Sequence, residues 1–211
     1  MTASDARALD GRTIGKRGAE TRRRLLDATG VLLRDRGVLE LRVVDIARSV
    51  GTSSSTYYQY FRDVDEAVLE LADEIGARDV EPLARLLDDP WDAELGLARA
   101  RTLVERFIHV WDDHSAVLHT RNLAAQEGDQ RFRETRNRTN RPFLEGFAAQ
   151  VRAHQAEGRI APDLSPMAAA AALMALIERM AAFHSDLAAL GVSRDDVVET
   201  TARIVFDTVV G

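Results

Sequence analysis

Hydroxyl-bearing side chains are concentrated in one short stretch of the chain, between Thr52 and Tyr60. Hydroxyl groups donate hydrogen bonds to phosphate oxygens and accept them from base edges, and tyrosines add aromatic area with a polar tip. This chemistry requires neighbouring elements that present the side chains together. The candidate residues of the stretch are Ser54, Ser55, Thr56, Tyr58 and Tyr60.

Residue types that perform catalysis or bind metals are missing or badly spaced. The chain of 211 residues has no cysteine, which excludes disulfides, thiolate metal sites and cysteine nucleophiles. His109, His114 and His119 are five positions apart, so a helix would scatter them, and we reject a metal site. Gly-rich phosphate loops and the Ser-x-x-Lys and Gly-x-Ser-x-Gly motifs are also absent from the sequence. An all-helical enzyme is therefore the least favoured hypothesis, and we predict no catalytic residue, metal or cofactor.

Charge is distributed unevenly along the chain. Residues 1–64 carry 12 Lys and Arg against 8 Asp and Glu, whereas residues 65–211 carry 16 against 26. A basic segment attached to an acidic body is typical of a phosphate-binding module joined to another domain, although the whole chain has a net charge of −6. The alternative explanation is a solvated arginine-rich face.

The composition is that of an ordinary globular protein, with 45% hydrophobic and 29% charged residues. The first residues lack the apolar core of a signal peptide. The longest apolar run, residues 167–177, covers 11 positions, where a membrane-spanning helix needs about 20. We therefore expect a cytoplasmic protein that makes no use of a membrane.

Apolar positions recur with helical spacing along most of the chain, which predicts an all-α fold of nine helices and no strand. Glycine, proline and capping residues mark the boundaries, among them Gly37, Gly51 and the caps Asp63, Ser165 and Ser193. Pro142 is expected to kink one long helix. The expected helices cover residues 21–37, 43–50, 53–61, 63–90, 91–114, 115–127, 129–158, 165–190 and 193–210.

Residues 21–61 have the layout of a helix-turn-helix, in which two short helices meet across Gly51 and pack on a longer one. A helix fits into the major groove of DNA, and this motif presents one rigidly. Ser53 is placed to cap the third helix, while Tyr57 and Phe61, four positions apart, are expected to face inward as core.

At this point the chain resembles the TetR family of one-component transcriptional regulators. The motif covers about residues 20–70, and the nine-helix plan extends the resemblance to the whole chain by architecture alone. It implies that the candidate residues named first, Ser54, Ser55, Thr56, Tyr58 and Tyr60, belong to a recognition helix that meets bases and phosphates. The segments that carry the resemblance are Asp45-Ile46-Ala47, Val50-Gly51-Thr52-Ser53 and Thr56-Tyr57-Tyr58-Gln59-Tyr60-Phe61.

The chain departs from the family pattern at three positions. Arg42 replaces a threonine or serine that caps the second helix, so the cap is lost and a cation that could reach a phosphate appears. Val64 replaces a phosphate-contacting lysine and continues an apolar stripe, which leaves Arg62 or Arg42 to compensate. Ser55 replaces a small residue and either adds a contact or fills the groove. These departures put in question which operator sequence the chain binds, more than whether it binds DNA.

Further arginines precede the motif, and two explanations remain open for them. Arg22, Arg23 and Arg24, together with the basic arm that contains Arg12, Lys16 and Arg17, either contact the DNA backbone and minor groove or are solvated. The resemblance implies three parts: a flexible basic arm at residues 1–18, a helix-turn-helix DNA-binding domain at 19–64, and a helical effector-binding and dimerisation domain at 65–211.

In the resembled family the later helices enclose a small-molecule pocket. Ligand cavities are mostly apolar with a few polar groups, although each apolar candidate is by itself more often core. His114, Asn122 and Glu178 are the polar candidates. The apolar candidates are Leu103, Phe107, Trp111, Leu118, Phe143, Phe147, Met174, Ile177 and Phe183. A run of arginines could instead receive an anionic ligand such as an acyl-CoA, with a solvated helix face as the favoured alternative: Arg131, Arg133, Arg136, Arg138 and Arg141.

The last two helices are the expected dimer interface. In the family they pair with a second subunit in a four-helix bundle, and residues 166–190 and 193–210 carry apolar stripes too wide for an exposed surface. Ten of the 23 residues from Ala168 to Leu190 are alanine, which permits close helix approach, although simple helix propensity also explains them. Two recognition helices must also reach successive major grooves about 34 Å apart.

We therefore favour a dimeric repressor that binds a palindromic operator of double-stranded DNA and is released by a largely apolar effector. A helical interaction module that has lost specific DNA binding is the second hypothesis, kept open by Arg42 and Val64.

Overall fold

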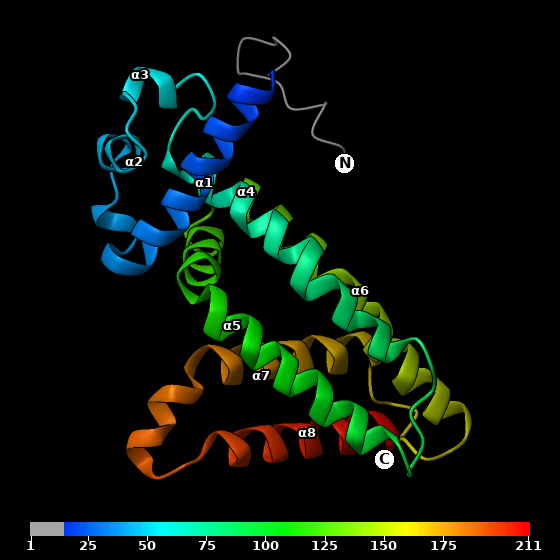
Figure 1. The fold of residues 1–211 in the computed structure, drawn as a ribbon. Helices are drawn as coiled ribbons and strands as arrows, with labels where there is room; N and C mark the ends of the chain where they lie inside the picture. Colours follow the sequence, from blue (N-terminus) through cyan, green and yellow to red (C-terminus); the bar gives the residue numbers. More distant parts are fainter. Residues whose placement is uncertain (1–14) are drawn as a thin grey trace. The chain divides into compact units, whose positions relative to one another are not determined.

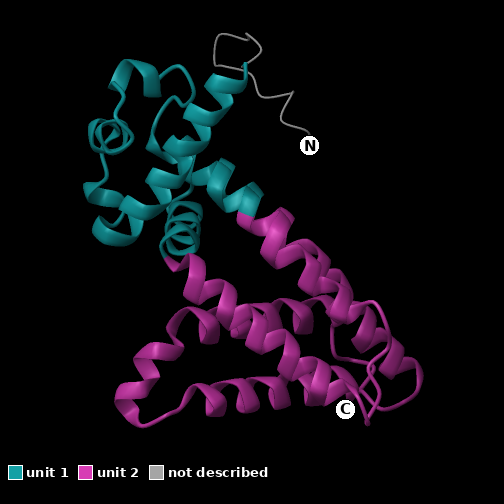
Figure 2. Ribbon diagram, viewed as in Figure 1, with its two compact units in different colours: residues 1–74, 116–135 teal, residues 75–115, 136–211 magenta. Residues whose placement is uncertain are grey.

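The computed structural model describes residues 15–211, which contain helices and connecting turns and no strand (Figure 1). The described chain divides into two compact units (Figure 2). Unit 1 contains residues 15–74 and 116–135, and unit 2 contains residues 75–115 and 136–211. Residues 1–14, with most of the expected arm and Arg12, lie outside the described residues.

Unit 1 is built around a module of four helices. The module consists of α1 (Lys16–Arg36), the 3-10 turn η1 (Val38–Glu40), α2 (Val43–Ser49), α3 (Ser54–Tyr57), and α4 (Val64–Ile75) up to Glu74. Each helix contributes large apolar side chains to a common core, which supplies most of the stability of such short helices. The fully buried members include Leu25, Leu26, Leu33, Ile46, Tyr57, Phe61 and Val68.

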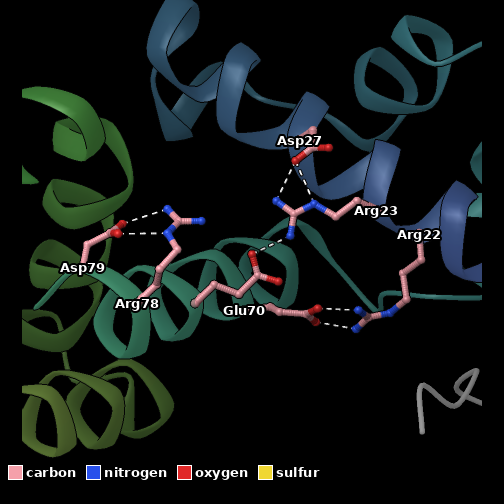
Figure 3. Close-up of polar contacts among 7 residues, drawn as sticks. Arg22, Arg23, Asp27, Glu70, Arg78 and Asp79 are labelled. Atoms are coloured by element: carbon pink, nitrogen blue, oxygen red, sulfur yellow. Dashed lines mark hydrogen bonds and ion pairs between the residues drawn. The ribbon is translucent and has the colours of Figure 1, made fainter. Parts of the chain in front are cut away.

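Arginines on α1 attach that helix to its neighbours (Figure 3). Arg22 forms a two-pronged ion pair with Glu70 of α4, and its guanidinium carbon lies 4.7 Å from the centre of the Phe61 ring. Arg23 pairs with Asp27 and, at 2.6 Å, with Glu74. Arg24 donates to the carbonyl oxygen of Val50 at 2.7 Å. These contacts link α1 to α4 and to the end of α2, while the Arg23 and Arg24 side chains stay exposed to solvent; DNA contact by the three arginines stays a prediction.

Unit 2 begins with irregular helix. The π-helical segment η2 (Gly76–Val80) and the 3-10 segment η3 (Glu81–Leu87) follow α4 directly. Then come α5 (Gly96–Gln126) up to Ser115 and α6 (Gln130–Ala156) from Arg136. The unit ends with α7 (Pro166–Leu187), the 3-10 turn η4 (Ala188–Leu190) and α8 (Arg194–Val210).

A buried glutamine fixes the loop that leads into α5. Gln150 of α6 accepts a hydrogen bond from the backbone N–H of Trp91 at 2.8 Å and donates to the carbonyl oxygens of Leu87 and Asp89. A buried amide with its polar atoms satisfied rigidifies a core. α6 also approaches η3 closely at Gly146, where a Cβ would lie 2.8 Å from the Leu87 side chain, so this position needs glycine.

The boundaries follow the expected pattern with three differences. Trp91 is buried but precedes α5, which begins at Gly96, and α1 begins at Lys16 rather than Thr21. The expected fifth and sixth helices, residues 91–114 and 115–127, are merged in α5, so residues 15–211 contain eight α-helices instead of nine. The expected boundary survives as a kink, since His114 has φ −130° and ψ 16° inside α5.

Several predicted helix ends are confirmed. Gly37 and Gly51 adopt positive φ angles of 74° and 73°, which glycine tolerates without strain. The Ser165 side chain accepts from the backbone N–H of Ala168, and Ser193 forms a capping box with Asp196. Pro142 lies inside α6, where it removes a backbone donor.

Residues 166–190 form one stretch that is long and apolar enough to cross a membrane by length and composition alone. A core helix of a soluble protein passes the same test. Here α7 packs against α8, and the residues buried along it include Leu173, Met174 and Ile177. About 33% of its apolar window is buried, and one such helix is weak evidence for a membrane span.

Candidate nucleic-acid interface and effector region

The turn between α2 and α3 is a compact helix-turn-helix connection. The backbone N–H of Thr52 donates to the carbonyl oxygen of Ala47 at 2.9 Å, and Gly51 supplies the left-handed residue. Ser53 then caps α3 as predicted, since its hydroxyl accepts from the backbone N–H of Thr56 at 3.2 Å. The geometry thus fixes the start of α3 relative to α2.

Two buried aromatic side chains anchor α3 to the core of unit 1. Tyr57 and Phe61 are both fully buried, as predicted, with ring centres 5.4 Å apart. The Tyr57 hydroxyl donates to the carbonyl oxygen of Asp63 at 3.0 Å, which ties α3 to the start of α4. Burial raises the pKa of Tyr57, with nearby Asp63 and Glu66 adding to the effect, so the hydroxyl stays a donor.

The candidate DNA-contacting residues lie on the other side of this anchor. Tyr58 is 52% exposed and Ser55 is also exposed, whereas Ser54, Thr56 and Tyr60 are half-buried. Thr56 shares a hydrogen bond with the Ser53 hydroxyl at 3.1 Å, which leaves its side chain partly committed to the cap. Exposed hydroxyl and aromatic groups beside a buried anchor fit a surface that contacts another molecule.

Arg42 stands at the N-cap of α2 and makes no side-chain cap bond, as its residue type predicts. Its Nε lies 3.2 Å from the carboxylate of Asp45. The same carboxylate lies 3.6 Å from Arg36 and 3.9 Å from Arg48. Sequence reasoning missed this cluster, although the spacing of Arg42, Asp45 and Arg48 on one helix face could have indicated it. The cluster holds three guanidinium groups around one largely buried carboxylate.

The start of α4 is set by acidic side chains. Asp63 caps the helix, because its carboxylate accepts from the backbone N–H of Glu66 at 2.7 Å. Arg62 pairs with Glu66 at 3.2 Å, so it does not stand alone as a replacement for the lysine that Val64 displaces. Burial raises the pKa of Glu66, but hydrogen bonds from the Arg62 backbone and side chain outweigh it and lower that pKa.

The predicted effector residues of unit 2 are tightly packed. Phe107 and Phe143 meet edge to face with ring centres 5.2 Å apart, and Phe183 lies under Arg179, whose guanidinium carbon is 3.7 Å from the ring centre. Sequence reasoning missed Trp91, which packs edge to face against Phe147. The residues of this group that are at most 3% exposed are Leu103, Phe107, Trp111, Phe143, Phe147, Met174 and Ile177.

Other predicted effector residues lie apart from that group or engage other partners. Leu118 and Asn122 belong to unit 1, where Asn122 accepts from the buried Arg121 at 3.0 Å. In unit 2, Asn140 donates to Glu178 at 3.3 Å. The arginine run is likewise divided, with Arg131 and Arg133 in unit 1 and Arg136, Arg138 and Arg141 in unit 2.

Exposed apolar side chains remain on α7 and α8. Met167 is 49% exposed and Ile204 is 45% exposed. Exposed alanines recur every three or four positions on α7, which places them along one helix face. These alanines are Ala168, Ala171, Ala172 and Ala175.

Three comparisons with known proteins bear on this geometry. The family model described as "Tetracyclin repressor-like, C-terminal domain" matches residues 83–211, more than half of the chain. A curated relative, the HTH-type transcriptional regulator EthR of Mycolicibacterium smegmatis, is 26% identical over 215 residues, covering 100% of this chain and 96% of the relative.

Solved structures share the fold. A transcriptional regulator of the TetR/AcrR family from Thermobifida fusca matches with a TM-score of 0.64 and 20% identity, covering 89% of this chain and 97% of that one. FadR from Bacillus subtilis, solved in complex with stearoyl-CoA, matches with a TM-score of 0.64 and 14% identity, covering 90% and 97%.

Proposed function

Because this chain belongs to the tetracycline repressor-like (TetR) family of transcriptional regulators, we propose that it is a repressor that binds a palindromic DNA operator as a dimer. A small-molecule effector then releases it from the operator. The single observation that carries this proposal is the capped α3, anchored by buried Tyr57 and Phe61 with Ser55 and Tyr58 exposed beside them. The repressor acts in the cytoplasm.

The proposed contacts divide into two kinds. Ser54, Ser55, Thr56, Tyr58 and Tyr60 meet bases and phosphates from α3 and the residues that follow it. Arg42 adds a charge-assisted contact to a phosphate from the start of α2. In the unbound protein Arg42 is paired with Asp45 but remains mostly exposed, so a phosphate can compete for it. Arg36 and Arg48 stay beside Asp45 and balance its charge when Arg42 turns outward.

The proposed dimer forms through α7 and α8. Exposed Met167, Ile204 and the alanine face of α7 support this assignment, since apolar area of this kind is buried in an obligate interface. Two-fold symmetry then pairs two recognition helices with two half-sites.

The proposed effector binds in unit 2 among the aromatic side chains around Phe107 and Phe143. These residues are closely packed, so a largely apolar effector has to displace side chains on entry. Leu118 and Asn122 of unit 1 remain predictions as effector contacts. An acyl-CoA belongs in the panel of trial effectors because the FadR relative was solved with one.

The DNA-binding proposal is tested by selecting duplexes from random DNA with the full-length protein. We expect enrichment of a palindrome whose half-sites lie about one helical turn apart. Recovery of sequences without a common motif, at low salt and after refolding to remove any bound ligand, would instead support the interaction module that has lost specific binding. Operator affinity measured across a panel of apolar metabolites then tests release, which an unchanged affinity throughout would contradict.

A further inference from the structure

Unit 2 contains a cleft of about 830 Å³ that shares only His114 with the predicted effector residues. Its walls come from the segments that follow α4 and from one face of α5. The cleft is therefore separate from the packed aromatic group around Phe107 and Phe143. Its lining residues are Arg78, Asp79, Pro82, Leu83, Glu105, Arg106, His109, Val110, Asp113 and His114.

Both walls of the cleft depart from regular α-helix. The π-helical η2 supplies Arg78 and Asp79, and the 3-10 segment η3 supplies Pro82 and Leu83. On the opposite wall His114 has the non-helical backbone that kinks α5. Single π-helical turns inside helices occur frequently at functional sites, and they re-aim the side chains that they carry.

One carboxylate joins the two walls. Asp79 accepts two hydrogen bonds from Arg78, at 2.9 and 2.7 Å (Figure 3), and its Oδ2 lies 3.0 Å from Nε2 of His114. The hydrogen bonds from Arg78, with a further contribution from His114, lower the pKa of Asp79. Asp79 is thus already neutralised within the cleft and has little charge left for a ligand.

The remaining charges of the cleft favour a cation. Among the described residues, the carboxylates of Glu105 and Asp113 and the guanidinium of Arg106 take part in no ion pair. Two free negative charges thus face one free positive charge. These unpaired groups therefore carry one excess negative charge.

Within residues 15–211, basic side chains around the neighbouring Asp112 are already paired, and Asp113 is not. His109, one turn away on the same face of α5, lies 3.0 Å from Arg194, and Arg194 in turn pairs with Asp112 at 3.2 Å. His184 also contacts Asp112 at 3.2 Å, so Arg194 and His184 are both paired with Asp112. Asp113 itself is exposed.

We propose that this cleft binds a small organic cation, whose ammonium group pairs with Asp113 while its apolar body lies against Pro82, Leu83 and Val110. A charge-assisted hydrogen bond and a partly apolar wall together suit an amphipathic amine. The Arg78–Asp79–His114 group forms one end of the site.

This inference rests on the proposed function and specifies a second place where an effector acts. The segment η2 is the direct continuation of α4, and α4 carries Glu70 and Glu74, the partners of Arg22 and Arg23 on α1. A ligand that shifts η2 therefore acts on the helix that holds α1 in the DNA-binding module. Ligands that shift no such element would leave operator affinity unchanged.

Three probes of similar shape and different charge test the proposal: phenethylamine, 2-phenylethanol and phenylacetate. Each is titrated into the full-length protein and followed by ligand-observed NMR. We expect phenethylamine to bind at least about tenfold more tightly than the alcohol, and phenylacetate to bind most weakly. Asp113→Asn should weaken binding of the amine about tenfold and leave binding of the alcohol unchanged. Asp186→Asn, which removes an exposed carboxylate of α7 outside the cleft, is the matched control.

A second variant fixes the location independently of charge. Pro82→Trp fills the cleft from an exposed position and should abolish binding of both amine and alcohol. Equal affinity for amine and phenylacetate, absence of amine binding, or amine binding that neither variant alters would overturn the proposal. Operator binding measured without any probe separates the two claims, because its absence contradicts the repressor and its presence with no amine binding contradicts only the cleft.

Discussion

The proposed recognition surface of unit 1 and the aromatic interior of unit 2 use large side chains in opposite ways. In unit 1, Tyr57 and Phe61 are buried so that their neighbours Ser55 and Tyr58 can be held outward. In unit 2, Phe107 and Phe143 are both the core and the predicted effector contacts. The residues that support the fold and the residues proposed to contact a ligand are therefore different in the first region and the same in the second.

This difference decides what a substitution can report. Where support and contact are separate, binding can be changed without changing stability, because an exposed side chain contributes little to the fold. Where they coincide, loss of effector binding cannot be distinguished from loss of packing. The cleft beside η2 resembles the recognition surface in this respect, since Asp113 is exposed while Leu83 and Val110 are buried.

The largest expected effect comes from removing an anchor. Tyr57→Ala should lower the free energy of unfolding by about 3–5 kcal/mol, because a buried ring is replaced by a cavity. Phe143→Ala in unit 2 should cost a similar amount. Measured below the unfolding temperature of both variants, operator affinity should fall only for Tyr57→Ala. A similar loss of affinity in both would contradict the separation of the two regions.

The second effect concerns an outward side chain. Tyr58→Ala should reduce operator affinity about tenfold, as loss of one good contact to a base does, while thermal unfolding stays unchanged. Val31→Ala, which shortens an exposed side chain on α1, serves as the control and should alter neither quantity. Fluorescence anisotropy with a labelled operator measures the affinity. A parallel drop in melting temperature would show that Tyr58 supports the fold instead.

The third effect is smaller and has two parts of opposite sign. Arg42→Thr restores an N-cap side chain to α2 and should raise the free energy of unfolding by about 1 kcal/mol. It also removes one phosphate contact, so the slope of log affinity against log salt should become shallower by about 0.9. Urea unfolding and a salt series measure the two quantities. An unchanged salt slope would mean that Arg42 stays with Asp45 when DNA is bound.

The smallest effect is the pH dependence of an ion pair in unit 2. Arg101 and Arg203 hold Glu199, and the hydrogen bond from Arg101 is the main cause that lowers the pKa of Glu199 from 4.5 to about 2. A lowered pKa in the folded state gives stability that is present above pH 4.5 and is lost as the pH falls toward 2. Glu199→Gln should therefore remove part of the fall in melting temperature across that range. If melting temperature depends on pH in the same way for Glu199→Gln and for the natural protein, this prediction is wrong.

Much of the fold could be predicted from the sequence because its signals are local. Ser53, Ser193 and Gly51 act on the backbone within a few residues, and each lies where it was expected. Where α5 begins depends on a distant residue, because Gln150 holds Trp91 in the loop before it. The kink at His114 lies at an expected boundary, but the contact of His114 with Asp79, 35 positions away, had no sequence signal.

The candidate site was less predictable than the fold. Buried Tyr57 and Phe61 follow from their spacing, but the contacts of Ser54, Ser55 and the other surface residues with DNA remain predictions. Arg22 and Arg23 could not be assigned from sequence, because their partners Glu70 and Glu74 belong to another helix. The cleft beside η2 had no sequence signal, since a π-helical segment and a kink create it jointly.

Specific DNA binding by α3 is the central claim, and one measurement tests it most directly. Full-length protein and the variant Ser55→Ala/Tyr58→Ala are titrated against the selected palindrome and against random duplex, each over a series of salt concentrations. We predict that the palindrome resists random competitor, that affinity falls steeply with salt, and that the variant loses affinity for the palindrome while its affinity for random duplex is unchanged. If the variant binds both duplexes as the natural protein does, α3 does not read the operator and the account is wrong.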